Sequence, residues 1–369
     1  MSAKKPLVPG NIENLKAYVA GKTIDEVREI YQPERISKLA SNENRLGCSS
    51  AVQPAVIEAL KQIQDYPDPI ARKLRKKLAE LNGCDADELI LAHGSESVIS
   101  IICRTFFLDG QNAVTANATF VGFFVQAGVR GAEIKKVPLD EEYRFNVDAL
   151  LDAVDSRTRM VYLANPNNPT GTYITDAELR RLTDELPEKL ILINDEAYFE
   201  YTGKLTDYPS FTSGESRPSN MITLRTFSKA YGLAGFRIGY GMADKELIAE
   251  MMKAKLTFEP TAPAQAAALA ALEDQDFIKK SLEVVEEGRE RLYSLFDQYG
   301  VRYVPSACNS VLMLLGSEDE ASEFTGKMLE NGVILRQMKA FGVPNGIRIT
   351  IGTREDMDHF ERNFKKIYA

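Results

Sequence analysis

A single lysine stands among residues that are suited to bind an anion. Thr226 and Ser228 precede Lys229, and Arg237 follows it on the same stretch. A lysine becomes a nucleophile only when its ammonium loses a proton, so it needs surroundings that lower its pKa. Hydroxyl groups and a guanidinium bind anions, above all phosphate. The stretch therefore indicates a reactive amine beside a phosphate site, with a polar surface turn as the alternative.

Further polar and aromatic side chains follow the predicted strands. Short apolar runs separated by helical segments predict a mostly parallel sheet that is covered on both faces. The predicted strands cover 89–92, 112–115, 159–164, 190–194 and 221–224. In such sheets, ligand-binding groups come from the loops at the carboxyl ends of the strands. These loops carry Ser95, Glu96, Phe120, Asn168, Asp195 and Tyr198.

Together these groups match the requirements of pyridoxal 5'-phosphate. A carboxylate at the end of an apolar strand is costly unless it is paired, and we expect Asp195 to hold the pyridine nitrogen protonated. Asn168 and Tyr198 are expected to hydrogen-bond the ring oxygen, and Lys229 to bind the aldehyde carbon. The groups expected around the phosphate are Thr226, Ser228, Arg237 and the backbone amides of Ser95 and Glu96, which open a helix.

Several motifs resemble those of a known enzyme family. Residues 165–171 read NPNNPTG, residues 195–198 read DEAY, and residues 226–240 read TFSKAYGLAGFRIGY. These motifs are similar to those of the fold-type I aminotransferases of class I/II. The motifs SNENRLG, YPDPIARKLRKKLA, HGSE, ILR and IRITIGT narrow the resemblance. From about residue 7 to residue 366, the chain resembles the histidinol-phosphate aminotransferases.

The resemblance implies roles for individual residues. It makes Lys229 the lysine that binds the cofactor and Phe120 the aromatic residue that stacks on its ring. It makes Arg348 the residue that holds the anionic end of the substrate, with Arg336 as a second candidate. It also implies that Tyr66 reaches the cofactor phosphate of the neighbouring subunit, which would make a homodimer the active unit.

Position 45 departs from the family pattern. The family commonly has a proline in the first motif, where this chain has Arg45. This turn lies near the substrate in relatives. Arg45 is either a solvated turn residue or an added positive charge at the mouth of the site that alters the choice of substrate.

The activity implied by the resemblance is a ping-pong transamination between histidinol phosphate and 2-oxoglutarate. The planar guanidinium of Arg348 suits a phosphate monoester and a carboxylate alike. An aromatic or broad-range aminotransferase and a threonine-phosphate decarboxylase share much of this sequence pattern and remain alternatives. A regulatory module that binds the cofactor would need a basic DNA-binding domain, for which the segment before residue 36 is too short.

The order of predicted elements indicates a three-layer α/β domain followed by a smaller α+β domain. We expect residues 46–270 to form the large cofactor-binding domain. Residues 1–45 and 271–369 are expected to form the small domain. A long amphipathic helix from about Asp276 to Tyr299 would connect the two, and Phe236–Met242 is expected to be a further strand.

Composition narrows the possible partners and location. The net charge is −8 without a basic block, which argues against a nucleic-acid partner. The start of the chain lacks the apolar run of a signal peptide, and no apolar run is long enough to span a membrane. We therefore expect a cytoplasmic protein. The four cysteines are scattered and only two histidines exist, so we expect no metal site.

Overall fold

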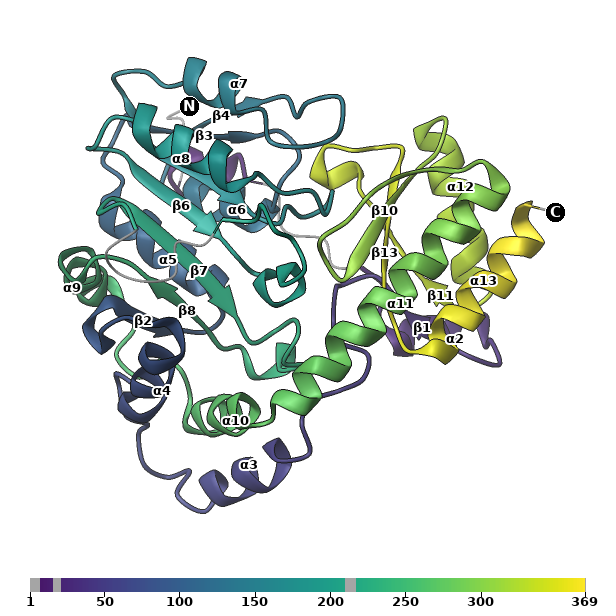
Figure 1. Cartoon of the computed structure of the whole chain (residues 1–369), viewed down its shortest axis with the longest axis horizontal. Helices are drawn as coiled ribbons and strands as arrows, with labels where there is room; N and C mark the ends of the chain where they lie inside the picture. The colour runs from purple at the N-terminus through teal and green to yellow at the C-terminus, as the bar shows by residue number, and fades with distance from the viewer. Residues whose placement is uncertain (1–6, 16–20, 210–216, 369) are drawn as a thin grey trace, which may run out of the picture.

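A seven-stranded sheet forms the centre of the larger part of the molecule (Figure 1). The computed structural model describes residues 7–15, 21–209 and 217–368. All neighbouring strands pair in parallel except β8, which is antiparallel to β2 and β7. The predicted, mostly parallel α/β sheet is confirmed. Its spatial order is β2 (Leu89–Ala92), β8 (Gly239–Met242), β7 (Met221–Thr226), β6 (Ile191–Asp195), β5 (Thr158–Ala164), β3 (Asn112–Ala116) and β4 (Glu133–Val137).

Alternate residues of the buried strands enter different cores, which makes the three layers. In β5, Met160 and Tyr162 join the core under α5 (Ser95–Phe106), α6 (Val121–Val129) and α9 (Lys245–Ala254). Val161 and Leu163 face the core under α7 (Val147–Asp152) and α8 (Asp176–Glu185). Beside that second core, Leu89 and Leu91 of β2 join a third core with α4 (Arg72–Asn82) and α10 (Ala262–Glu273), and α3 (Val52–Leu60) packs on α10. This alternation follows from the two-residue period of a strand.

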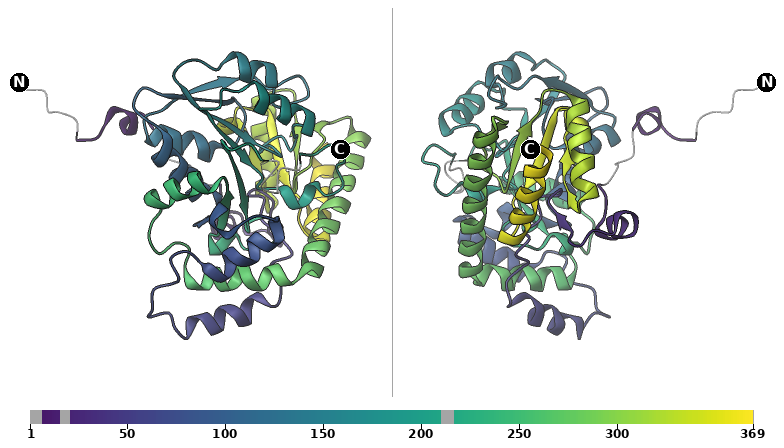
Figure 2. Two further views of the ribbon diagram at one scale, coloured as in Figure 1. Left: turned by 60° about the vertical axis from the view of Figure 1, so that its left-hand side comes forward. Right: turned by 90° about the vertical axis from the view of Figure 1, so that its right-hand side faces the viewer.

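A second sheet forms the smaller part of the molecule. It is antiparallel, in the order β12 (Arg336–Gln337), β13 (Gly346–Thr350), β10 (Ser310–Leu314) and β9 (Arg302–Val304). Three helices pack on its outer side: α11 (Gln275–Tyr299), α12 (Glu318–Glu330) and α13 (Arg354–Tyr368) (Figure 2). The long α11 starts beside α10, next to the larger part of the molecule, and runs on along the small sheet (Figure 1), as the sequence predicts.

The N-terminal part of the chain joins the two sheets. After α1 (Gly10–Glu13) and α2 (Ile24–Tyr31), β1 (Ser37–Lys38) pairs in parallel with β11 (Val333–Ile334). Residues 37–46, which we call the strap, then cross to the lysine stretch. The amide of Thr350 in the small sheet donates to Leu39 O at 2.9 Å. At the other end, Asn44 Nδ2 donates to Ala230 O at 2.9 Å.

Three details differ from expectation. The strand expected at Phe236–Met242 starts only at Gly239, because Arg237 has a left-handed φ of 53° and turns the chain first. The sequence analysis also did not predict β9 and β12, which are too short to show the alternation of apolar and polar residues that marks a strand.

In the described ranges, no helix has the length and apolar character needed to cross a membrane. The domain division at residues 45/46 and 270/271 stays a prediction.

Candidate active site

A cavity of about 120 Å³ opens at the carboxyl ends of the parallel strands. The loops after β2, β3, β5, β6 and β7 all reach it. The segment before β8 reaches it too, because this strand runs antiparallel and starts at the same edge. The cavity brings together most of the predicted cofactor residues. Its lining consists of Gly94, Ser95, Glu96, Phe120, Ala164, Pro166, Asn168, Asp195, Ala197, Tyr198, Thr226, Ser228, Lys229 and Arg237.

Lys229 follows β7 and lines this cavity. Burial lowers the pKa of Lys229 to about 8, and the positive charge of Arg348 acts in the same direction. Its Nζ lies 5.5 Å from the centre of the Tyr198 ring. A larger fraction of the amine is therefore neutral at neutral pH than in an exposed lysine, as a nucleophile requires.

Asp195 ends β6 with one satisfied and one unsatisfied oxygen. The Tyr162 hydroxyl donates to Oδ2 at 2.8 Å. The buried Oδ1 has no hydrogen-bond partner within the described part of the chain. Burial raises the pKa of Asp195 to about 6, although Tyr162 and the amide of Ala197 act in the opposite direction. A buried oxygen without a partner is costly, so this geometry suits an N–H group that enters the cavity.

Anion-binding groups gather at the other end of the cavity. Ser95 and Glu96 open α5, where unpaired backbone amides and the helix dipole favour an anion. The Thr226 hydroxyl donates to Ser228 Oγ at 3.0 Å. The guanidinium of Arg237 approaches this end so closely that a Cβ on Gly94 would lie 3.1 Å from its Nη2. Hydroxyls, amides and a guanidinium around one point match a phosphate.

Asn168 and Arg348 connect the cavity to the small sheet. Arg348 Nη1 donates to Asn168 Oδ1 at 2.6 Å, and its Nη2 donates to Ala40 O at 2.6 Å. Arg336 lies directly opposite Arg348 in the pairing of β12 with β13, so both side chains project from the same face. Neither arginine lines the cavity of Lys229, and the guanidinium of Arg336 lies so close to Gly21 that a Cβ there would be 3.1 Å from its Nη1.

Comparisons with known proteins agree with this geometry. The family described as "Aminotransferase class I and II" matches residues 34–363. The chain belongs to this family. A histidinol-phosphate aminotransferase of Anoxybacillus flavithermus is 42% identical over 349 residues, which are 94% of this chain and 93% of that protein. A second from Bacillus cereus is 41% identical over 354 residues, which are 96% and 94% of the two chains.

Solved structures are similar along the whole chain. The structure of histidinol-phosphate aminotransferase from Sinorhizobium meliloti in complex with pyridoxal-5'-phosphate has a TM-score of 0.90 and 27% identity. The similarity covers 100% of this chain and 98% of that one. An aspartate aminotransferase of Thermus thermophilus has a TM-score of 0.81 at 22% identity, which shows a shared fold.

The residues of this aminotransferase fit pyridoxal phosphate. The unsatisfied Asp195 Oδ1 suits a pyridinium N–H, and Phe120 lines the cavity beside it. The Lys229 amine and the cluster of phosphate-binding groups occupy the same cavity. The described residues therefore offer a partner for the ring nitrogen, the aldehyde carbon and the phosphate.

Tyr66 does not lie in this cavity. Its side chain is 79% exposed, and its ring stacks on Phe258 with centroids 4.1 Å apart. Within one subunit, Tyr66 therefore has no place in the site. Its predicted role, contact with the cofactor of a second subunit, stays a prediction.

Sequence reasoning missed two supporting groups. Tyr162, whose ring stacks on Phe123 at 4.3 Å, holds Asp195 from the neighbouring strand. Arg225 Nε donates to Glu196 Oε2 at 2.9 Å, in a buried ion pair beside Asp195 and Thr226. A signal existed for both, because a tyrosine and an arginine within apolar strands need buried partners.

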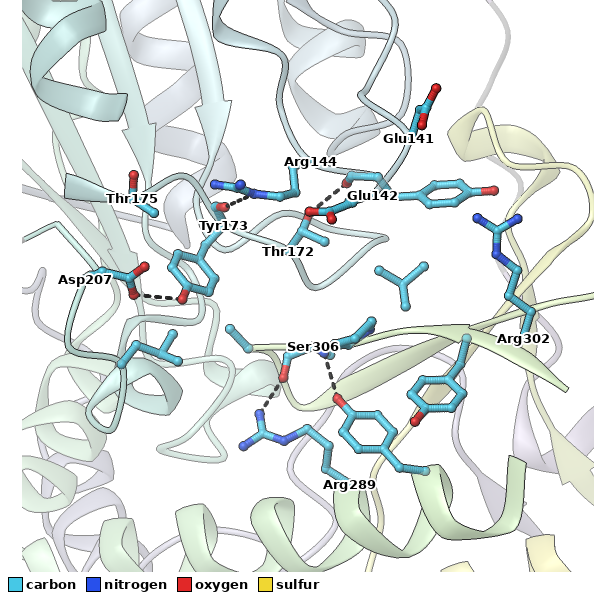
Figure 3. Close-up of a pocket in the computed structure, with 17 residues that line it drawn as sticks. Glu141, Glu142, Arg144, Thr172, Tyr173, Thr175, Asp207, Arg289, Arg302 and Ser306 are labelled. Atoms are coloured by element: carbon cyan, nitrogen blue, oxygen red, sulfur yellow. Dashed lines mark hydrogen bonds between the residues drawn. The ribbon is translucent and has the colours of Figure 1, made fainter. Parts of the chain in front are cut away.

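A larger cavity of about 650 Å³ lies between the two sheets and is not the active site (Figure 3). None of its lining residues lines the cavity of Lys229. Several of its polar groups already have partners in the protein. Arg144 pairs with Glu178, and the Tyr173 hydroxyl donates to Asp207 at 2.8 Å.

Proposed function

We propose that this chain is a pyridoxal phosphate-dependent aminotransferase that transfers an amino group between histidinol phosphate and 2-oxoglutarate. One observation carries the proposal: an amine of lowered pKa, Lys229, shares a cavity with an unsatisfied buried carboxylate oxygen of Asp195. Perturbed pKa values of opposite sense in one cavity mark catalytic sites. Membership of the aminotransferase family supports the reaction class.

Each group around the cavity has a defined task in this proposal. When bound, the cofactor supplies an electron-poor ring that accepts the electron pair left at Cα of the amino donor. Asp195 Oδ1 accepts the N–H of the ring nitrogen and keeps it protonated. Asn168 and Tyr198 hydrogen-bond the ring oxygen, and Phe120 stacks on the ring. The phosphate is held by Thr226, Ser228, Arg237 and the amides of Ser95 and Glu96.

Lys229 moves the proton. Its Nζ would hold the aldehyde carbon of the cofactor in the resting enzyme. As a free amine, Nζ would take up the proton from Cα of the amino donor as a general base and then give it back as a general acid. Its pKa of about 8 lies close to neutral pH, where a general base that must also act as an acid works best.

Arg348, Arg336 and Asn168 are the proposed substrate-binding residues. Arg336 lies opposite Arg348 in the pairing of β12 with β13, and Asn168 accepts a hydrogen bond from Arg348. A phosphate monoester and the carboxylate of 2-oxoglutarate can both accept bidentate hydrogen bonds from arginine. Support for histidinol phosphate as the donor comes from the names of the relatives that are 40–42% identical.

A half-reaction assay tests the proposal. The purified holoenzyme is mixed separately with histidinol phosphate, phenylalanine, tyrosine and glutamate, and conversion of bound pyridoxal phosphate to pyridoxamine phosphate is followed. We expect conversion by histidinol phosphate and glutamate. Conversion by phenylalanine and tyrosine but not by histidinol phosphate would make the protein an aromatic aminotransferase. Release of CO2 from threonine phosphate would make it a decarboxylase.

The proposed active unit is a homodimer in which Tyr66 of each subunit reaches the cofactor phosphate of the other. Tyr66 is exposed and stacks on the exposed Phe258, which supports a protein interface there. Other exposed apolar side chains lie close to these two in the sequence: Ile57, Leu60, Ile63 and Leu256.

We also propose a cytoplasmic location and the division into a large domain of residues 46–270 and a small domain of residues 1–45 and 271–369. Cys48, Cys84, Cys103 and Cys308 are all free thiols, which supports a reducing compartment. The course of α11, which joins the two sheets, supports the division.

A further inference from the structure

The strap reaches the active site through one buried side chain, Asn42. Asn42 Nδ2 donates to the hydroxyl oxygen of Tyr198 at 2.8 Å. Asn42 is 1% exposed and Tyr198 is 3% exposed, so water does not compete for this bond. Tyr198 also lines the cavity of Lys229. Asn42 therefore contacts a residue of the site without lining the cavity itself.

The surroundings of Asn42 decide which end of its amide faces Tyr198. The backbone amide of Asn42 donates to Thr350 Oγ1 at 2.9 Å. The single proton of that hydroxyl then points to Asn42 Oδ1, which lies 3.0 Å away. Because Oδ1 accepts from Thr350, the NH2 group must face Tyr198. The direction of the hydrogen bond to Tyr198 is thus fixed by a side chain of β13.

A tyrosine hydroxyl has one proton to donate. Since its oxygen accepts from Asn42, that proton is directed away from the strap. We propose that Asn42 is a positioning residue: it orients the Tyr198 hydroxyl so that its proton is donated into the cavity, to the ring oxygen of the cofactor. This inference rests on the proposed function, because it requires pyridoxal phosphate in the cavity.

Hydrogen bonds from two segments of the smaller part of the molecule hold Asn42 in place. Asn309 Nδ2 donates to Asn42 O at 3.0 Å. Asn42 itself has a left-handed φ of 54°, which asparagine tolerates better than most residues. The neighbouring Ala40 O accepts from Arg348. A displacement of the amide would break bonds to two different segments of the small domain.

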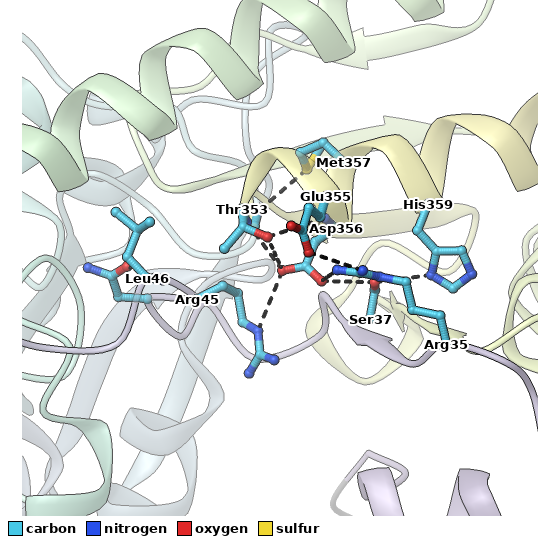
Figure 4. A network of polar contacts seen from close by, with 11 residues as sticks. Arg35, Ser37, Arg45, Leu46, Thr353, Glu355, Asp356, Met357 and His359 are labelled. Atoms are coloured by element: carbon cyan, nitrogen blue, oxygen red, sulfur yellow. Dashed lines mark hydrogen bonds and ion pairs between the residues drawn. The ribbon is translucent and has the colours of Figure 1, made fainter.

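Asp356 anchors both ends of the strap (Figure 4). The Ser37 hydroxyl donates to its Oδ1 at 2.9 Å, and Arg45 Nε lies 4.0 Å from its Oδ2. Thr353 Oγ1 donates to Oδ2 at 2.9 Å. One buried carboxylate of α13 thus fixes the strap before and after Asn42, which keeps the amide within reach of Tyr198.

The proposal predicts a change in the titration of the bound cofactor. Donation by Tyr198 stabilises the anionic ring oxygen, which shares a proton with the Lys229 nitrogen. Without that donation the shared proton is held more tightly, so the pH midpoint of the visible absorption band rises. The titratable and charged groups that surround Tyr198 are retained in the variants below. They are Tyr162, Asp195, Tyr201, Lys229, Cys308 and Arg348.

Asn42→Asp is the main variant. Its carboxylate accepts the Tyr198 proton and turns it away from the cavity. We expect the midpoint to rise by about 1 pH unit, the effect of losing one hydrogen bond. We also expect the affinity of the cofactor-free protein for pyridoxal phosphate, measured by equilibrium dialysis, to fall by about fivefold.

Two control variants distinguish the orientation of the Tyr198 hydroxyl from the effect of an added negative charge. Asn44→Asp places the same charge on the strap, at a side chain that contacts Ala230 O and Ser281 Oγ. We expect a clearly smaller shift from it. In a Tyr198→Phe background, Asn42→Asp should add almost no shift, because the hydroxyl that it reorients is gone.

Each outcome is decisive. Equal shifts from Asn42→Asp and Asn44→Asp, or an undiminished shift in the Tyr198→Phe background, would overturn the inference. If Asn42→Asp does not fold, Thr350→Val releases the Asn42 amide, and a smaller rise that disappears with Tyr198→Phe is expected. A wild-type midpoint in that variant overturns the inference. Absence of a cofactor band in the wild-type protein overturns the proposed function as well.

Discussion

At the scale of single residues, Lys229 and Asp195 carry pKa shifts of opposite sense. Burial lowers the pKa of Lys229 to about 8 and raises the pKa of Asp195 to about 6. In both cases burial disfavours the charged form. The cavity therefore holds two groups whose charged forms are destabilised by burial. A bound cofactor that supplies partners for them would stabilise these charged forms.

Lys229→Ala removes the amine that binds the cofactor and moves the proton. We expect the turnover number to fall by at least about 1,000-fold, while the protein stays folded. The measurement is the rate of transamination, with circular dichroism as the control for folding. Wild-type turnover in this variant would show that another group is the base.

Asp195→Asn is expected to stabilise the cofactor-free protein. The carboxyl ionises near 3.8 when unfolded and near 6 when folded, so the free energy of unfolding decreases as pH rises between these values. Above about pH 6, the buried charged carboxylate lowers the free energy of unfolding by about 3 kcal/mol, and the neutral amide of asparagine removes this loss. Denaturant unfolding of both proteins on either side of this range measures the effect.

The same variant should be a poor enzyme. Its turnover number is expected to fall by at least about 100-fold, since a neutral amide does not keep the ring nitrogen protonated. An effect on KM alone would contradict the role of Asp195. If Asp195→Asn raises the free energy of unfolding over that of the wild-type protein no more above pH 6 than below pH 4, the raised pKa of Asp195 is contradicted.

At the scale of elements, the strap explains the departure at position 45. Arg45 is 29% exposed and its Nε lies 4.0 Å from Asp356 Oδ2. Asp356 has other partners in Ser37, Thr353 and Arg35. The structure therefore directs Arg45 toward α13, as an anchor of the strap.

Arg45→Ala is expected to lower the free energy of unfolding by no more than about 1 kcal/mol, because partly exposed ion pairs contribute little. The ratio of kcat/KM values for histidinol phosphate and phenylalanine should stay unchanged. Arg35→Ala removes another cation from Asp356, just before the start of the strap, and serves as the control. A changed ratio in Arg45→Ala alone would place Arg45 at the substrate.

Local patterns predicted elements better than they predicted contacts between them. The capping box of Thr175 and Glu178 and the apolar run of β6 are local signals, and both elements lie where expected. The short β9 and β12 depend on pairing with β10 and β13, so no local pattern reveals them. The strand expected from Phe236 starts only at Gly239, because the local pattern also does not show the left-handed backbone of Arg237.

The candidate site shows the same limit. Lys229 and Asp195 stand out because a charged residue at the end of an apolar strand needs a reason. The contacts of Asn42 and Tyr162 join segments that are distant in sequence. The sequence shows that Tyr162 needs a buried partner, but it does not show which residue that partner is. Only the folded chain identifies their partners.

At the scale of the whole molecule, the proposed dimer can be tested by complementation. Lys229→Ala and Tyr66→Phe proteins are mixed, unfolded and refolded together to form hybrid dimers. A hybrid contains one site in which both residues are intact, so we expect it to recover activity that neither parent shows in full. The measurement is activity against the mixing ratio, with each parent refolded alone as the control. Activity equal to the average of the parents would place Tyr66 outside the partner's site.

The backbone contact between the end of the strap and the lysine stretch has a consequence for folding. Gly232 has a φ of 70°, and a Cβ on it would lie 1.8 Å from Gly47 O, so no side chain fits there. The loop that carries Lys229 thus takes its final shape only against a segment from near the start of the chain. Closing so long a loop is slow. We therefore expect the catalytic loop to be completed late in folding, after the segment around Gly47 has reached the large sheet.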